Sequence, residues 1–115
     1  MIISLSIPVM NRTYDLRKTL PETIKAANAS PPVEIVILNY DSKDDLDQYL
    51  AEVFDTAQLA EGNRLTYAKS SNHSYFSISH ARNLAVLASC GEYAVVLDAD
   101  IILHADCIQA IRALI

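Results

Sequence analysis

The chain has 115 residues, about half of them hydrophobic, and a formal net charge of −5 at pH 7. This length suits a single domain spanning residues 1–115, and the negative charge argues against a protein that binds the backbone of DNA or RNA. A nucleotide ligand is still compatible with it, because a metal ion and a few basic side chains can meet the ligand's charge locally.

Hydrophobic periodicity predicts four strands that alternate with four helices. The strand-like segments are short runs of branched apolar residues, whereas the helical segments repeat apolar residues every three or four positions. The strands are predicted at residues 2–9, 33–38, 65–68 and 93–103, and the helices at residues 16–27, 46–53, 77 or 79 to 90, and 105–115.

Local signals refine these elements. Pro21 predicts a kink or two consecutive pieces in the first helix. Ser42, with Asp45 three residues later, predicts the N-cap of the second helix. Gly91 lies where a left-handed C-cap of the third helix belongs.

Strict alternation of strands and helices predicts an α/β fold with a Rossmann-like parallel sheet and helices on both faces. If the strand order is 3-2-1-4, the winding direction reverses between strands 1 and 4, and ligands bind at such a point, outside the carboxyl ends of the strands. Residues 8–12, 39–42 and 98–100 follow strand ends and are therefore expected to share one rim.

Asp98 and Asp100 interrupt the fourth predicted strand, whose apolar run suggests burial on both faces. Side chains two apart on a strand point the same way, so the two carboxylates would repel each other unless a cation, hydrogen bonds or a shared proton relieves them. A hard divalent ion such as Mg²⁺ or Mn²⁺ would suit them. The alternative is a turn cap beside a solvated carboxylate, because Asp-x-Asp is common by chance.

Five short segments, in this order along the chain, resemble the nucleotide-sugar-binding half of a family 2 glycosyltransferase of the GT-A fold. They are Ile-Pro-Val-Met-Asn-Arg at 7–12, Leu-Asn-Tyr-Asp-Ser at 38–42, Ser-His-Ala-Arg-Asn-Leu-Ala at 79–85, Gly-Glu-Tyr at 91–93 and Leu-Asp-Ala-Asp at 97–100. The resemblance implies a nucleotide-diphosphate sugar as ligand and Mn²⁺ or Mg²⁺ as cofactor.

The resemblance also implies roles for single residues. Asp100 would ligate the metal ion, and Asp98 would face the ribose or the water shell of the metal. Asp41 would hydrogen-bond the base or ribose, or form an Asx turn. The other implied donor-site residues are Pro8, Asn11 and Arg12 at the first strand end, and Arg82 and Asn83 in the Ala-Arg-Asn element.

In the resembled family, the acceptor-binding half and the catalytic base lie beyond the point where this sequence ends. We therefore expect a truncated donor domain that binds donor but transfers little sugar alone, since an inverting transfer needs a base near the acceptor hydroxyl. The uncovered edge of the fourth strand predicts a homodimer. The alternatives are a non-catalytic nucleotide-binding or regulatory module of the same fold, and a receiver-like or flavodoxin-like domain.

The remaining residues carry weaker expectations. Cys90 and Cys107 lack metal-site spacing and are expected to be reduced, buried thiols, which favours a cytoplasmic location. No segment approaches the length of a membrane span, and the apolar N-terminus lacks the basic part of a signal peptide. His80 is expected at a helix start, His73 in a mobile loop, and His104 exposed before the last helix.

Overall fold

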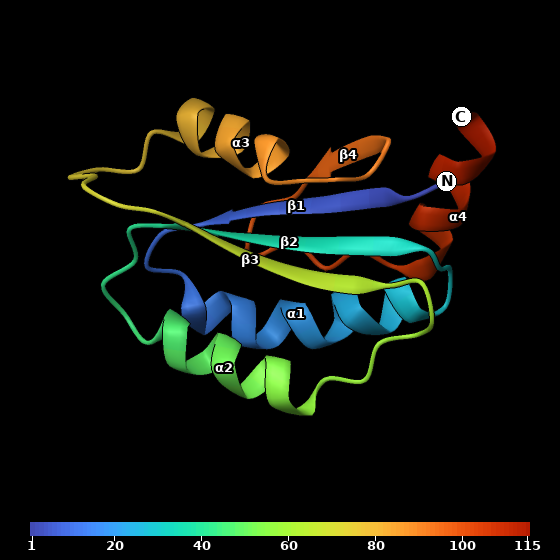
Figure 1. Cartoon of the computed structure of the whole chain (residues 1–115), viewed down its shortest axis with the longest axis horizontal. Helices are drawn as coiled ribbons and strands as arrows, with labels where there is room; N and C mark the ends of the chain where they lie inside the picture. The colour runs from blue at the N-terminus through green and yellow to red at the C-terminus, as the bar shows by residue number, and fades with distance from the viewer.

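Four strands alternate with four helices in the computed structural model, which describes residues 1–115 (Figure 1). The elements are β1 (Ile3–Val9), α1 (Thr13–Asn28), β2 (Val33–Tyr40), α2 (Leu46–Thr56), β3 (Arg64–Ser70), α3 (Ile78–Leu87), β4 (Tyr93–Val96) and α4 (Ala105–Leu114). All eight predicted elements are present, with shifts at their ends.

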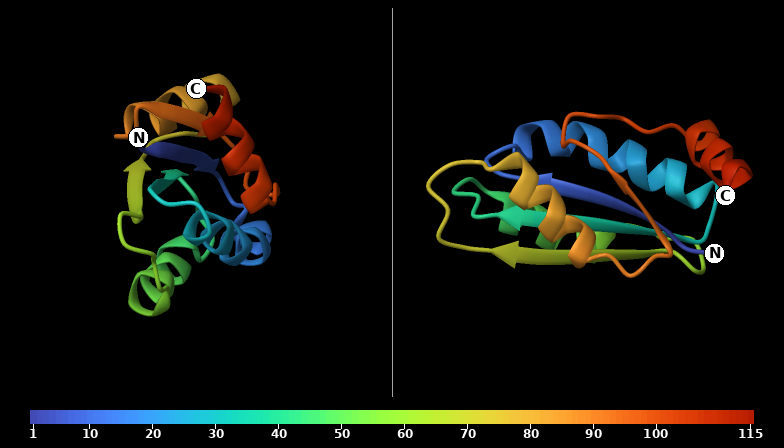
Figure 2. Two further views of the ribbon diagram at one scale, coloured as in Figure 1. Left: turned by 90° about the vertical axis from the view of Figure 1, so that its right-hand side faces the viewer. Right: turned by 90° about the horizontal axis from the view of Figure 1, so that it is seen from above.

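The four strands form one parallel sheet in the order β3-β2-β1-β4, which confirms the predicted α/β fold and strand order. In the register, Leu5 of β1 lies beside Ile35 of β2 on one side and Val95 of β4 on the other. α1 and α2 cover one face of the sheet and α3 covers the other, so helices lie on both faces (Figures 1 and 2). The reversal between β1 and β4 is the predicted ligand-binding position.

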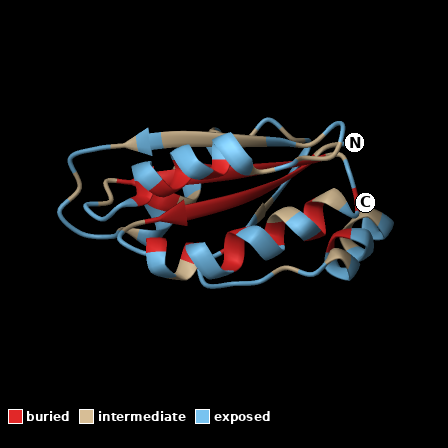
Figure 3. Cartoon of the chain, turned by 90° about the horizontal axis from the view of Figure 1, so that it is seen from below, coloured by how far each residue is buried: buried red, intermediate tan, exposed pale blue.

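The core has two layers because the central strands are covered on both sides. Every residue of β1 and β2 is buried (Figure 3). The larger apolar cluster joins the sheet to α1, α2 and α4, with Ile108 of α4 fully buried. The smaller cluster joins β2 to α3 through Leu38, Tyr40, Ala81 and Ala85.

Two predictions about the helices differ from the structure. α1 is a single helix that includes Pro21, so the prediction of two consecutive pieces is wrong. Buried Leu16, Leu20 and Ala27 lie on both sides of the proline. Ser42 does not cap α2, which begins at Leu46. The Ser42 hydroxyl instead accepts the Asn11 N–H at 3.0 Å, so it joins two loops.

β4 is shorter and more exposed than predicted. It ends at Val96, and its position at the edge of the sheet leaves Tyr93 and Val96 exposed, so burial on both faces is wrong. Gly91 is not a left-handed cap either, because the only glycine with positive φ is Gly62. A Cβ at Gly91 would lie 2.5 Å from Ser4 Oγ, so close approach to β1 is what requires glycine there.

Both cysteines are exposed free thiols, which contradicts their predicted burial. Cys90 follows the end of α3, and Cys107 lies on a face of α4 that the sheet does not cover. No helix in the structure combines the length and apolar character needed to cross a bilayer.

Candidate donor-binding site

Three residues with a left-handed backbone conformation lie at the rim formed by the carboxyl ends of the strands. Asn11, Asp41 and Asn72 have φ values of 56°, 53° and 68°, and each lies just after β1, β2 or β3. Asn and Asp tolerate this conformation better than other non-glycine residues do. Backbone strain of this kind gathers at functional sites, so the three loops are the first place to look for one.

The loops after β1 and β2 are joined by reciprocal hydrogen bonds. The Asn11 side-chain oxygen accepts the Lys43 N–H at 2.6 Å, while the Ser42 hydroxyl accepts the Asn11 N–H. The Asp44 carboxylate accepts the Thr13 N–H at 3.0 Å, at the start of α1. The two loops therefore form one support under the rim.

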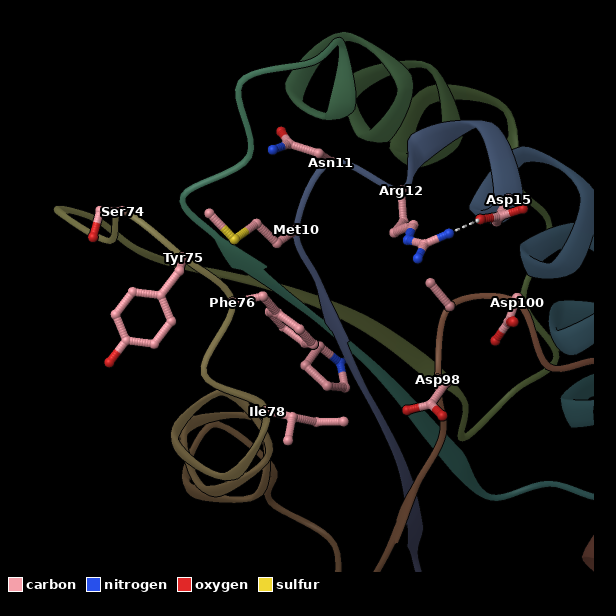
Figure 4. A pocket seen from close by; sticks show the side chains of 12 residues that line it. Met10, Asn11, Arg12, Asp15, Ser74, Tyr75, Phe76, Ile78, Asp98 and Asp100 are labelled. Carbon is pink, nitrogen blue, oxygen red and sulfur yellow. Dashed lines mark hydrogen bonds and ion pairs between the residues drawn. The ribbon is translucent and has the colours of Figure 1, made fainter.

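A cavity of about 540 Å³ opens at this rim (Figure 4). It brings together five of the eight predicted site residues: Pro8, Asn11, Arg12, Asp98 and Asp100. The other lining residues are Met10, Asp15, Ser74, Tyr75, Phe76, Ile78 and Ala99.

Asp98 and Asp100 lie in the segment after β4, not within a strand. Leu97 and Ala99 beside them are buried while both aspartates are exposed, so the in–out alternation continues past the strand end. The Ala99 carbonyl accepts the Thr19 hydroxyl of α1 at 2.7 Å. This contact anchors the segment to α1 and keeps both carboxylates at the cavity.

The cavity carries an excess of negative charge. Its lining has one guanidinium, on Arg12, and three carboxylates, on Asp15, Asp98 and Asp100. Arg12 pairs with Asp15 at 3.3 Å (Figure 4), and Asp98 pairs with Arg82 at 3.2 Å. A phosphorylated ligand would meet net repulsion here unless a cation accompanied it.

Asp41, Arg82 and Asn83 do not line the cavity. The Asp41 carboxylate faces away, where it accepts the His73 N–H at 2.9 Å and pairs with Lys43 Nζ at 2.9 Å. The His73 N–H, together with Lys43, lowers the pKa of Asp41 below its ordinary value. Arg82 reaches the site only through Asp98, and Asn83 is exposed on α3.

Sequence reasoning missed the wall of the cavity opposite the aspartates, formed by Ser74, Tyr75, Phe76 and Ile78 (Figure 4). The predicted topology could have indicated this wall, because the segment follows the carboxyl end of β3 and has two aromatic side chains, which are exposed in the structure. Adjacent exposed aromatic side chains at a strand-end rim are candidates for contact with a ligand.

The three histidines lie where the sequence predicts them. His104 is exposed and immediately precedes α4, and His80 lies in the first turn of α3. His73 lies in the loop between β3 and α3, where its ring stacks on Tyr40 with the centroids 3.8 Å apart.

Residues 4–115 match the model of a protein family described as "Glycosyl transferase family 2". The chain belongs to glycosyl transferase family 2. The predicted family resemblance is therefore confirmed over nearly the whole length of the chain. No curated protein sequence matches this family 2 chain.

Solved structures of S. aureus TarS share the fold. TarS 1-349 is 18% identical with a TM-score of 0.75, and the match covers 98% of this family 2 chain and 32% of TarS 1-349. The complex of that protein with UDP matches at 17% identity and a TM-score of 0.70, covering 98% and 31% of the two chains. Its complex with UDP-GlcNAc matches at 19% and 0.67, covering 98% and 30%. The chain thus spans about a third of the length of these TarS structures.

Proposed function

We propose that the cavity binds a nucleotide-diphosphate sugar together with a divalent metal ion, Mn²⁺ or Mg²⁺. The observation that carries this proposal is the convergence of Pro8, Asn11, Arg12, Asp98 and Asp100 on one rim cavity in a family 2 chain. The complexes of TarS with UDP and with UDP-GlcNAc support the ligand class.

The donor set suits a hard ion that is shared with the ligand. No three histidine, cysteine or carboxylate side chains cluster closely enough to hold a metal by themselves. Mg²⁺ is usually held by one or two carboxylates plus substrate phosphates, and Asp98 and Asp100 provide such a pair. When bound, the ion would neutralise negative charge on the diphosphate leaving group. Asp100 makes no ion pair in the protein, so its carboxylate is free for this role.

The remaining predicted residues would act around this pair. Arg82 would orient Asp98 through their ion pair, and Arg12 would face the phosphates. Asp41 would support the neighbouring loop through the His73 N–H rather than touch the nucleotide. For Asn83, which does not line the cavity, contact with the donor stays a prediction.

We propose further that these residues form the donor half of a glycosyltransferase and that this half transfers little sugar alone. No side chain around the cavity matches the family position of the base that deprotonates the acceptor. Robust transfer to an acceptor by this polypeptide would overturn the idea of an isolated donor half.

Isothermal titration calorimetry with UDP- and GDP-sugars tests ligand binding. Because the lining of the cavity carries excess negative charge, we expect measurable affinity with Mn²⁺ present and at least about tenfold weaker binding when the metal is chelated. Metal alone should bind weakly, since the ligand supplies part of its coordination shell. Equal nucleotide affinity with and without metal would count against the metal-dependent site.

The open edge of β4 predicts self-association. Tyr93 and Val96 are exposed on this edge strand, and an uncovered apolar edge can pair with another copy. We expect a homodimer in multi-angle light scattering, weakened by Val96→Lys because a charge on the edge opposes pairing. Monomer at all accessible concentrations would dismiss the dimer.

A further inference from the structure

The wall segment, residues 71–77 between β3 and α3, is not held in place by its own burial. Tyr75 and Phe76 of this segment line the cavity, yet their exposed fractions are 72% and 41%. Asn72, the second residue of the segment, has a left-handed backbone conformation. Its position must therefore come from contacts made by its flanking residues.

Tyr40, the last residue of β2, provides these contacts. Its side chain is 2% exposed, and its ring stacks on His73 with the centroids 3.8 Å apart and the planes at 8°. Phe76 and His80 meet the same ring edge to face, at 5.7 Å and 5.5 Å. The Tyr40 hydroxyl and His80 Nδ1 share a hydrogen bond of 2.7 Å. One buried phenol ring thus contacts residues before, within and after the lining part of the wall.

Hydrogen bonds around His73 complete the anchor. The His73 N–H donates to Asp41, and His73 Nε2 shares a 2.7 Å hydrogen bond with the Ser70 hydroxyl. Asp41 is itself held by Lys43. The anchor therefore joins the end of β2, the end of β3 and the start of α3 at the back of the wall segment.

The two imidazoles also face each other, with ring centroids 5.4 Å apart. Three other titratable or charged groups surround the two rings. They are the Tyr40 phenol of β2, the Asp41 carboxylate just after β2, and the Lys43 ammonium of the following loop. The anchor is therefore a cluster of three rings, each of which also has a polar partner.

We propose that Tyr40, His73 and His80 are positioning residues that set the wall of the donor cavity and thereby strengthen donor binding. The ligand part of this inference rests on the proposed function, whereas the anchoring part does not. None of the three residues lines the donor cavity, so they act through Ser74–Phe76.

The test measures affinity for UDP-GlcNAc with Mn²⁺ by calorimetry at pH 7.5. The double variant His73→Gln/His80→Gln binds about tenfold more weakly than the wild-type chain, because binding must then also order side chains of the wall. The matched control His104→Gln binds like the wild-type chain. A double variant with wild-type affinity overturns the proposal.

Hydrogen exchange of residues 71–77 without ligand separates this inference from the proposed function. Tyr40→Phe removes the hydrogen bond to His80 but keeps the ring, so exchange in the segment accelerates at neutral pH while the fold is retained. Tyr93→Phe, at an exposed position of β4, leaves it unchanged. If the wild-type chain binds no nucleotide but Tyr40→Phe still accelerates exchange of residues 71–77, the proposed function fails and the anchor stands. If exchange in Tyr40→Phe equals that of the wild-type chain, the anchor is overturned.

Discussion

Glu34→Ala is expected to lower the free energy of unfolding by about 2–4 kcal/mol, because it removes a buried acceptor of four hydrogen bonds and leaves buried donors such as the Ser4 hydroxyl without a partner. The Glu34 side chain on β2 has no solvent exposure. Its carboxylate accepts hydrogen bonds from Ser4 Oγ at 2.7 Å, Thr66 Oγ1 at 2.9 Å, Arg64 Nε at 2.9 Å and the Cys90 N–H at 2.7 Å. One carboxylate therefore joins β1, β2, β3 and the turn before β4. Against a typical total of about 5–15 kcal/mol, this loss would leave the fold marginal in urea denaturation.

The matched control is Glu22→Ala, which makes the same change at an exposed position of α1. It should alter the free energy of unfolding by less than about 0.5 kcal/mol. Equal urea midpoints for Glu34→Ala and Glu22→Ala would show that the buried network contributes little.

The same network makes stability depend on pH. Burial raises the pKa of Glu34, but the hydrogen bonds from the Cys90 N–H, Ser4, Thr66 and Arg64 outweigh burial and hold the pKa below its ordinary value. Because the folded state has the lower pKa, the stabilisation is complete above the unfolded value of about 4.3 and is lost as the pH falls through the folded value. In urea titrations, the stability gap between wild type and Glu34→Gln should therefore persist from pH 5 to 7 and shrink below about pH 4.

The fold was predictable because its signals are local. Branched apolar runs and helical stripes identified every element, and their alternation predicted the parallel sheet. The errors arose where distant residues decide the outcome. Ser42 looked like a helix cap until its partners in the β1 loop were known. Glu34 lies inside an apolar strand, and nothing near it in the sequence indicated partners at positions 4, 64, 66 and 90.

The candidate site was likewise predictable in part, where strand order decides the position of a residue. Pro8, Arg12, Asp98 and Asp100 follow strand ends, so topology alone predicted their convergence, and they do line one cavity. Which way Asp41 turns depends on its left-handed backbone and on the His73 N–H, and neither is visible in sequence. The wall segment was missed because loop conformation depends on tertiary contacts.

Asp100→Ala is expected to weaken metal-dependent binding of UDP-GlcNAc about 100-fold or more. Substitution of a residue that only orients a metal ligand already costs about 10- to 100-fold in affinity, so removal of the proposed carboxylate ligand itself should cost at least as much. Folding should be nearly unaffected, because the Asp100 side chain is exposed and makes no ion pair in the protein. Calorimetry with Mn²⁺ at saturating and chelated levels measures the effect.

Asp55→Ala is the matched control, since Asp55 is exposed on α2 and does not line the cavity. It should bind donor like the wild-type chain, with the same dependence on metal.

Asp98→Ala should lose affinity as well. This substitution also removes the only ion pair of Arg82, which leaves an unneutralised guanidinium near the diphosphate. Part of the lost metal charge is then replaced, so the residual metal-independent affinity should be higher for Asp98→Ala than for Asp100→Ala. Unchanged affinity in Asp100→Ala would instead favour a nucleotide-binding module of this fold that uses no metal.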